Sequence, residues 1–167
     1  MTLDTTLRVE LIRLHALTTA ESEAVLGLQI SAEQLEFAGA VAKSVTACEA
    51  GDPAGVAGLA IRAANDIVGW VALKRGASAP DWVGSGAVAV SGLRIDRRHQ
   101  GRGLGPLALA ELAHWVARHW PESAQLVLRV DDDNHAGIRA YEKAGWVETG
   151  ERRVGRVGLE RTMALAL

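Results

Sequence analysis

The chain has 167 residues, and we predict that residues 1–167 form one domain around a single hydrophobic core. Apolar residues make up 49% of it, whereas a formal net charge of −2 offers no basic footprint for a nucleic acid. The one cysteine excludes an internal disulfide framework, and the chain shows neither a signal-peptide pattern nor the roughly 20 apolar residues of a membrane span. We therefore expect a cytoplasmic protein that binds neither membranes nor nucleic acids.

The first predicted elements are a strand and two short helices. Residues Thr6 to Leu14 alternate apolar and polar side chains, which is typical of a half-buried strand. Capping-box patterns then start at Thr18 and at Ser31, and each predicts the N-terminus of a helix. We expect the second of these helices to continue through its apolar positions as far as Val45.

Three strands are predicted in the middle of the chain. After the break at residues 51–53, residues 56–62 and 67–74 have the pattern of two strands joined by a tight turn. The almost wholly apolar stretch 87–95 predicts a strand in the centre of the sheet. The pair Ser91-Gly92 inside this strand indicates a β-bulge.

The last part of the chain alternates helices and strands. Apolar residues recur on one face of a helix that follows Gly105 and that Pro121 ends. Asn134 and Gly145 are typical boundary residues at the start and at the end of a second helix. The remaining predicted strands cover residues 124–130, 147–153 and 157–165.

A glycine-rich loop, Gln100 to Gly105, joins the fourth predicted strand to the helix that follows. Glycines let backbone N–H groups converge on an anion, and a helix N-terminus adds favourable partial charge, so this arrangement predicts a phosphate-binding site. A nucleotide P-loop does not fit, because Pro106 follows Gly105 where a lysine is needed. A dinucleotide fingerprint does not fit, because Pro106 or Ala108 stands at its third glycine. A turn that only caps the helix remains the alternative.

The pattern that does fit residues 100–105 is Q-x-x-G-x-G. With it the chain resembles the GCN5-related N-acetyltransferase (GNAT) family, whose acyl-coenzyme A loop has this form. A second segment, Asn134 to Trp146, resembles the family's later N-x-x-A-x-x-x-Y-x-K-x-G-F motif and follows the loop in the required order. Gly137 and Trp146 depart from that motif, since alanine and phenylalanine are usual there.

The resemblance implies an α/β (α+β) fold with a mixed, mostly antiparallel central sheet of six or seven strands and about four flanking helices. In this fold the fourth and fifth strands splay apart, and the pantetheine arm of the cofactor enters the gap as an additional strand. The implied cosubstrate is acetyl-CoA, with no metal ion. The implied acceptor is the amine of a small molecule, and a homodimer is left open.

The resemblance also assigns cofactor contacts. Backbone groups of the fourth strand at Leu93, Arg94 and Ile95 would bind pantetheine and polarise the thioester carbonyl. A purely structural role is the alternative for several of the other residues: a solvated loop for the arginines, a helix cap for Asn134 and a solvated helix position for Lys143. The other implied contacts are Arg98, Gln100, Gly101, Arg102, Gly103, Leu104, Gly105, Asn134, Gly137, Ile138, Tyr141 and Lys143.

Tyr141 matches the residue that usually protonates the leaving thiolate in the family. A tyrosine has a pKa of about 10 and a thiol one of about 8.5, so the hydroxyl is protonated at neutral pH. A tyrosine that only packs under its helix is the alternative. For the general base we select Glu36, with Glu33, Asp81 and a chain of water molecules as alternatives.

The acceptor is the least constrained part of the prediction. Residues 28–37 resemble family members that act on polyamines or diamines, while a peptide N-terminus or an aminoglycoside remains open. The run Asp131–Asp133 is expected to be a solvated strand end, and attraction of a cationic substrate is the alternative. The rival functions are a non-catalytic acyl-CoA-binding module and an N-terminal protein acetyltransferase.

Overall fold

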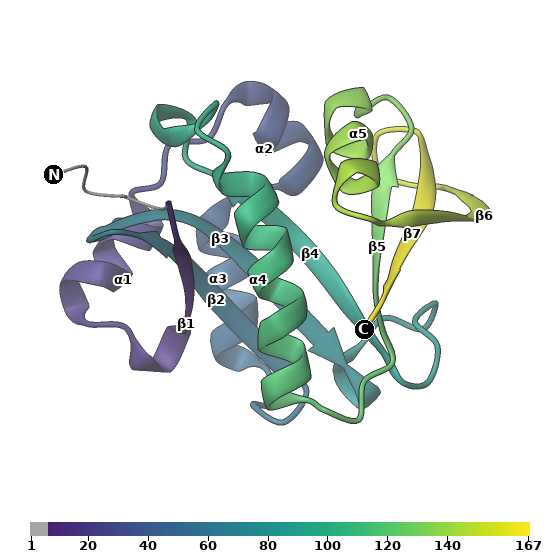
Figure 1. Ribbon diagram of the computed structural model, residues 1–167, viewed down its shortest axis with the longest axis horizontal. Helices are drawn as coiled ribbons and strands as arrows, with labels where there is room; N and C mark the ends of the chain where they lie inside the picture. Colours follow the sequence, from purple (N-terminus) through teal and green to yellow (C-terminus); the bar gives the residue numbers. More distant parts are fainter. Residues whose placement is uncertain (1–6) are drawn as a thin grey trace, which may run out of the picture.

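The computed structural model describes residues 7–167, which build one sheet with helices on both of its faces (Figure 1). The described strands lie in the order β1-β2-β3-β4-β5-β7-β6, and neighbours are antiparallel except for β4 and β5. This confirms the predicted mixed sheet with an apolar central strand. The strands are β1 (Val9–Arg13), β2 (Val56–Ala63), β3 (Asp66–Arg75), β4 (Ala87–Ile95), β5 (Gln125–Asp131), β6 (Val147–Val154) and β7 (Leu159–Ala166). The helices are α1 (Thr19–Leu26), α2 (Ala32–Ala38), α3 (Val41–Ala50), α4 (Leu104–His119) and α5 (His135–Lys143), with 3₁₀ turns at Leu14–Ala16, Gly76–Ser78 and Arg97–His99.

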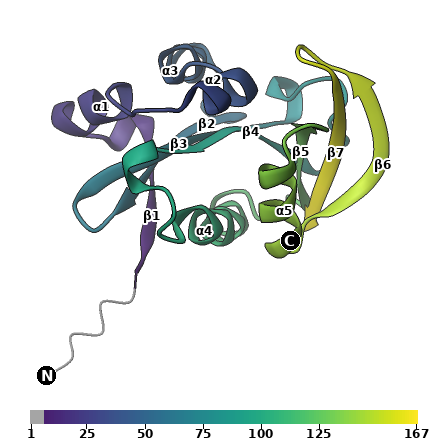
Figure 2. The same cartoon turned by 90° about the horizontal axis from the view of Figure 1, so that it is seen from above.

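The helices divide between the two faces of the sheet, with α1, α2 and α3 on one face and α4 and α5 on the other (Figure 2). Under α4 and α5 lies the larger hydrophobic cluster, in which Leu112 and Val116 of α4 are almost fully buried. The smaller cluster packs Val25 and Val45 around Trp70, whose Nε1 donates to Ser44 Oγ at 2.9 Å. Each fully buried aliphatic side chain of this kind contributes about 1.5–3 kcal/mol, so both layers are firmly attached to the sheet.

The predicted second helix is two helices, which gives five α-helices in residues 7–167 against the four or so expected. Gly39, between α2 and α3, has a φ of 72°, in the left-handed region that glycine tolerates. The Arg94 guanidinium donates hydrogen bonds to the carbonyl groups of Ala38 and Gly39 at 3.0 and 2.8 Å. These two carbonyl groups therefore do not accept hydrogen bonds from a further turn of helix. The break therefore depends on a residue of β4, which a capping pattern does not reveal. The predicted first strand shortens to β1, and Thr6 lies outside the described residues.

The parallel pair β4 and β5 is joined only at its start. Ala87–Ala89 pair with Gln125–Val127, and beyond these residues the two strands separate. On its β5 side, the second half of β4 thus presents its backbone groups to a gap and not to a paired strand.

On its other side, β4 pairs with β3 through a bulge, since Ala72 faces Ser91 but Trp70 faces Arg94. Gly92 adopts a φ of 62° there, which confirms the bulge predicted at Ser91-Gly92.

Candidate active site

A continuous cleft runs through the gap between β4 and β5. One part, of about 500 Å³, follows the glycine loop and the start of α4. The other part, of about 610 Å³, lies between β4, β5, α2 and the β6–β7 hairpin. Gln34, Leu93, Gln100, Ala136 and Tyr141 line both parts. We call the first the loop half and the second the open half of the cleft.

The glycine loop has the geometry of an anion cradle. Gly101 and Gly103 adopt φ angles of 75° and 78°, which side chains other than glycine rarely take. A Cβ atom added at Gly101, Gly103 or Gly105 would meet no other atom within 4 Å, so the space beside each glycine is open. Gly103 is also the N-cap of the 16-residue helix α4 and leaves the first helical N–H groups without a side-chain cap. The loop therefore fits a diphosphate.

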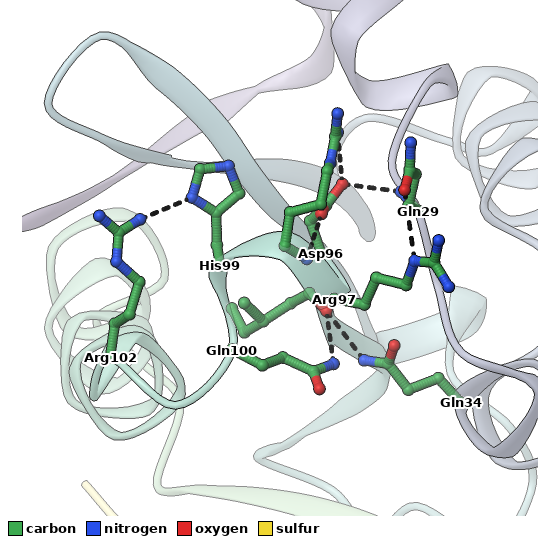
Figure 3. Close-up of polar contacts among 9 residues, drawn as sticks. Gln29, Gln34, Asp96, Arg97, His99, Gln100 and Arg102 are labelled. Carbon is green, nitrogen blue, oxygen red and sulfur yellow. Dashed lines mark hydrogen bonds and ion pairs between the residues drawn. The ribbon is translucent and has the colours of Figure 1, made fainter.

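The loop is anchored by Asp96, a fully buried carboxylate at the end of β4 (Figure 3). Asp96 accepts from the Gln29 N–H at 2.7 Å and from the Arg98 N–H at 2.8 Å. It also accepts from the Arg98 guanidinium at 2.9 and 2.7 Å. The Arg98 guanidinium and these backbone N–H groups hold the pKa of Asp96 well below its usual range. Arg98, predicted as a phosphate contact, is thus engaged with Asp96.

Two glutamine side chains hold the last carbonyl group of β4. Gln100 Nε2 donates to the Ile95 carbonyl at 3.0 Å, and Gln34 Nε2 donates to the same carbonyl at 2.9 Å (Figure 3). The motif glutamine therefore shapes the loop rather than only lining it, and Gln34 joins α2 to the same point. Arg102 lies further out, where its guanidinium contacts His99 Nδ1 at 2.9 Å.

Arg94 has a structural side chain. It is 2% exposed, and its guanidinium donates to the Gly92 carbonyl at 2.7 Å as well as to the two carbonyls at the end of α2. Burial lowers the pKa of Arg94 to about 10, so it still carries its charge at neutral pH. The predicted cofactor contact at Arg94 rests on the backbone alone, and the side chain ties the bulge to α2.

Helix α5 supplies the second motif. Asn134 Oδ1 accepts from the Gly137 N–H at 3.0 Å, so Asn134 is the helix cap as well as a cleft residue. A Cβ atom at Gly137 would lie 2.6 Å from Asn134 Nδ2, so an alanine there requires the Asn134 side chain to shift. Ile138 is buried in the core, and Lys143 is exposed outside the residues that line the cleft. Neither of these two side chains lines the cleft, and the cofactor contacts predicted for them stay predictions.

Tyr141 stands where the two halves of the cleft meet. Its ring packs against Trp146 with a centroid distance of 5.7 Å. Burial raises the pKa of Tyr141 to about 12, so the hydroxyl keeps its proton throughout the neutral range. This combination of position and protonation suits a proton donor to an atom in the cleft.

The open half is lined by charges of both signs: the acids Glu33, Asp131 and Glu160 and the arginines Arg129 and Arg153. The choice of base made from the sequence considered neither Glu160 nor Asp131. The Oδ1 atom of Asp131 is buried without a hydrogen-bond partner among residues 7–167, and burial raises the pKa of this carboxyl.

Glu36, our predicted base, lies on the exposed side of α2 and is not among the residues that line the cleft. Its charge still acts on Asp131, because it helps to raise the pKa of that carboxyl. The alternative Asp81 is also exposed and outside the lining. Of the carboxylates considered from the sequence as bases, Glu33 is the one that lines the open half.

In residues 7–167, no three His, Cys, Asp or Glu side chains gather into a metal-binding group. Among the helices that the structure describes, none is long and apolar enough to cross a membrane.

A model of the acetyltransferase (GNAT) family matches residues 21–146. The uncharacterized N-acetyltransferase YbbJ of Bacillus subtilis (strain 168) is 33% identical over 75 residues. That match covers 43% of this chain and 45% of YbbJ, so the similarity spans a little under half the length of this relative.

Solved structures share the fold at low sequence identity. The aminoglycoside acetyltransferase AAC(6')-Ib, in complex with ribostamycin and coenzyme A, has a TM-score of 0.73 at 18% identity, over 95% of this chain and 93% of that one. The spermidine N-acetyltransferase of Vibrio cholerae, in complex with CoA and spermine, has a TM-score of 0.72 at 14% identity, over 95% of both chains. At such identities these structures show the fold alone.

Proposed function

We propose that this chain, which belongs to the acetyltransferase (GNAT) family, transfers the acetyl group of acetyl-CoA to the primary amine of a small molecule. The observation that carries the proposal is the position of Tyr141 between the glycine loop, whose shape fits a diphosphate, and the open half of the cleft, which charged side chains line. When bound, acetyl-CoA supplies a thioester whose carbonyl carbon accepts the amine and whose sulfur leaves as a thiolate.

The loop half binds and orients the donor. Main-chain N–H groups of residues 101–105 and the N-terminus of α4 hold the diphosphate. After Ala89, β4 no longer pairs with β5. The backbone groups of β4 near Leu93 are therefore available to the pantetheine arm by strand addition. A backbone donor aimed at the developing oxyanion is typically worth about 3 kcal/mol.

The proton balance involves a carboxylate of the open half and Tyr141, which lies between the two halves. A carboxylate of the open half, Asp131 or Glu33, takes a proton from the ammonium form of the acceptor, and Glu36 is kept as the exposed alternative. The amine then forms the C–N bond while the C–S bond breaks. Tyr141 donates its proton to the sulfur, and the proton released by the amine restores the tyrosine.

A thiol-release assay with acetyl-CoA and a panel of amines tests the proposal. The panel includes polyamines and diamines, which the sequence favours, together with aminoglycosides and peptide N-termini. We expect release of free CoA with at least one small amine, and formation of the matching amide by mass spectrometry. Binding of coenzyme A by calorimetry without turnover across the panel contradicts catalysis and supports a non-catalytic module.

Two further predictions accompany the function. A homodimer is tested by light scattering of the purified chain at several concentrations. A cytoplasmic location is tested by fractionation of the cells that produce the protein.

A further inference from the structure

Strand β5 places two opposite charges on the wall of the open half. Arg129 and Asp131 are two residues apart on the strand, so their side chains leave the same face about 6.6 Å apart along it. Both line the open half of the cleft. The residues between and before them, Val130 and Leu128, are buried, so the strand is otherwise apolar here.

Among residues 7–167, Arg129 is a cation without an ion pair. Its guanidinium lies 4.0 Å from the ring centroid of Trp82, which covers one face of it. Its Nε and Nη1 atoms are buried and make no hydrogen bond in the described part of the chain. Burial and the nearby Arg153 lower the pKa of Arg129, while Glu160 and Glu151 act on it only through space and raise that pKa.

Asp131 is the matching anion. Its neighbour Asp132 is neutralised by Arg161 at 2.8 Å and by Arg152 at 3.5 Å. Asp131 has no ion pair among residues 7–167, and its Oδ1 is buried without a partner. Arg156 and Glu36 act on it only through space, with opposite effects on its pKa. Within the acidic run, Asp132 is therefore paired outside the cleft, whereas Asp131 is an unpaired carboxylate in the cleft wall.

We propose that the acceptor is an amino-acid-like zwitterion, with Arg129 binding its carboxylate and Asp131 binding its ammonium group. This inference rests on the proposed function. A partly buried charge without a partner is costly, and a ligand that carries both signs compensates both side chains. A polyamine satisfies Asp131 but is repelled by Arg129, and an amine without an acid group leaves Arg129 uncompensated.

The test compares free L-amino acids with their own α-carboxamides in the thiol-release assay. Each pair has the same side chain and the same amine, and differs in whether the carboxyl group is charged. Because a charge-assisted hydrogen bond contributes about 1.5–3 kcal/mol, we expect the best amino acid to exceed its amide at least tenfold in kcat/KM.

Variants assign the effect to each side chain. In Arg129→Met the ratio between acid and amide should fall close to one, and Arg129→Lys should restore part of it. Asp131→Asn should lower kcat/KM for both members of a pair, since both present an ammonium group. Arg118→Met, on the outer part of α4 where Arg118 pairs with Glu111, is the matched control.

Several outcomes overturn the inference. Equal rates for acids and amides in the unaltered protein overturn it while leaving the proposed acetyl transfer intact, and this comparison needs no variant to fold. A loss of coenzyme A affinity in Arg129→Met, measured by calorimetry, also overturns it, because the anion bound would then belong to the cofactor. Absence of acetyl transfer to every amine tested removes the proposed function itself.

Discussion

The two halves of the cleft differ in how their polar groups are satisfied. Behind the loop half, the buried Asp96 carboxylate accepts four hydrogen bonds, and the Ile95 carbonyl in the lining accepts two, all from within the chain. In the open half, Arg129 and Asp131 have no partner among the described residues. Saturated polar networks hold a fixed geometry, whereas unpaired groups gain energy only from a ligand. The contrast indicates that the loop half is pre-organised, and it supports our proposal that the open half selects the acceptor.

The largest effect is expected at Tyr141, which belongs to both halves. Tyr141→Phe removes only the hydroxyl, and loss of a general acid typically costs a factor of about 100 or more. We expect kcat to fall roughly a hundredfold, and the affinity for acetyl-CoA to change far less. Single-turnover kinetics together with calorimetry measure the two quantities, and an unchanged kcat removes the role assigned to this residue.

Asp96→Asn tests the fully hydrogen-bonded network at the glycine loop. The substitution takes a buried charge away from the Arg98 guanidinium and should lower the free energy of unfolding by about 2 kcal/mol at neutral pH. Urea unfolding measures it, and Asp81→Asn at an exposed carboxylate is the control.

The same variant has a defined pH dependence. The pKa of Asp96 is depressed in the folded state, so its contribution is complete above the unfolded value of about 3.9 and is lost as pH falls through the folded value. The difference between the unaltered protein and Asp96→Asn should therefore shrink as pH is lowered below about 4. A difference that does not shrink as the pH is taken well below 4 contradicts the anchoring role.

Gly103→Val tests whether the loop binds phosphate through its shape. A valine at a φ of 78° is strained by about 1–2 kcal/mol, and its side chain occupies the open space beside the loop. We expect the affinity for coenzyme A to fall roughly tenfold, or about 1.4 kcal/mol.

Gly150→Val is the matched control for this strain. Gly150 in β6 has a φ of 90° and equally open surroundings, but it does not line the cleft. It should lose stability without losing coenzyme A affinity, as calorimetry and thermal melting will show. Equal affinity losses in the two variants argue against the loop as the binding site.

The smallest effect is expected at Glu36, whose exposed side chain acts on the open half only by its charge. An exposed charge contributes less than about 1 kcal/mol, so Glu36→Gln should change kcat/KM by a few-fold at most and less at high salt. Glu33→Gln, in the cleft lining, should have the larger effect. The reverse order in a salt series supports Glu36 as the base predicted from the sequence.

The sequence by itself determined the fold class, most strands and the loop half. The apolar stretch 87–95, the glycine loop and the caps at Thr18, Ser31 and Asn134 act over a few neighbouring residues, so their patterns are visible along the chain. The bulge at Gly92 could also be predicted from the sequence, because a glycine inside an apolar strand is a local signal.

Only the tertiary structure decided how the open half is assembled. It brings together Trp82 from the β3–β4 loop, Arg129 and Asp131 from β5, and Glu160 from β7. Whether Asp131 or Asp132 meets the cleft depends on the alternation of β5 and on the arginines of β6 and β7. The split at Gly39 likewise depends on Arg94, 55 residues later in the chain. These contacts join residues that are distant in sequence, and their energies depend on burial and charge that exist only after folding.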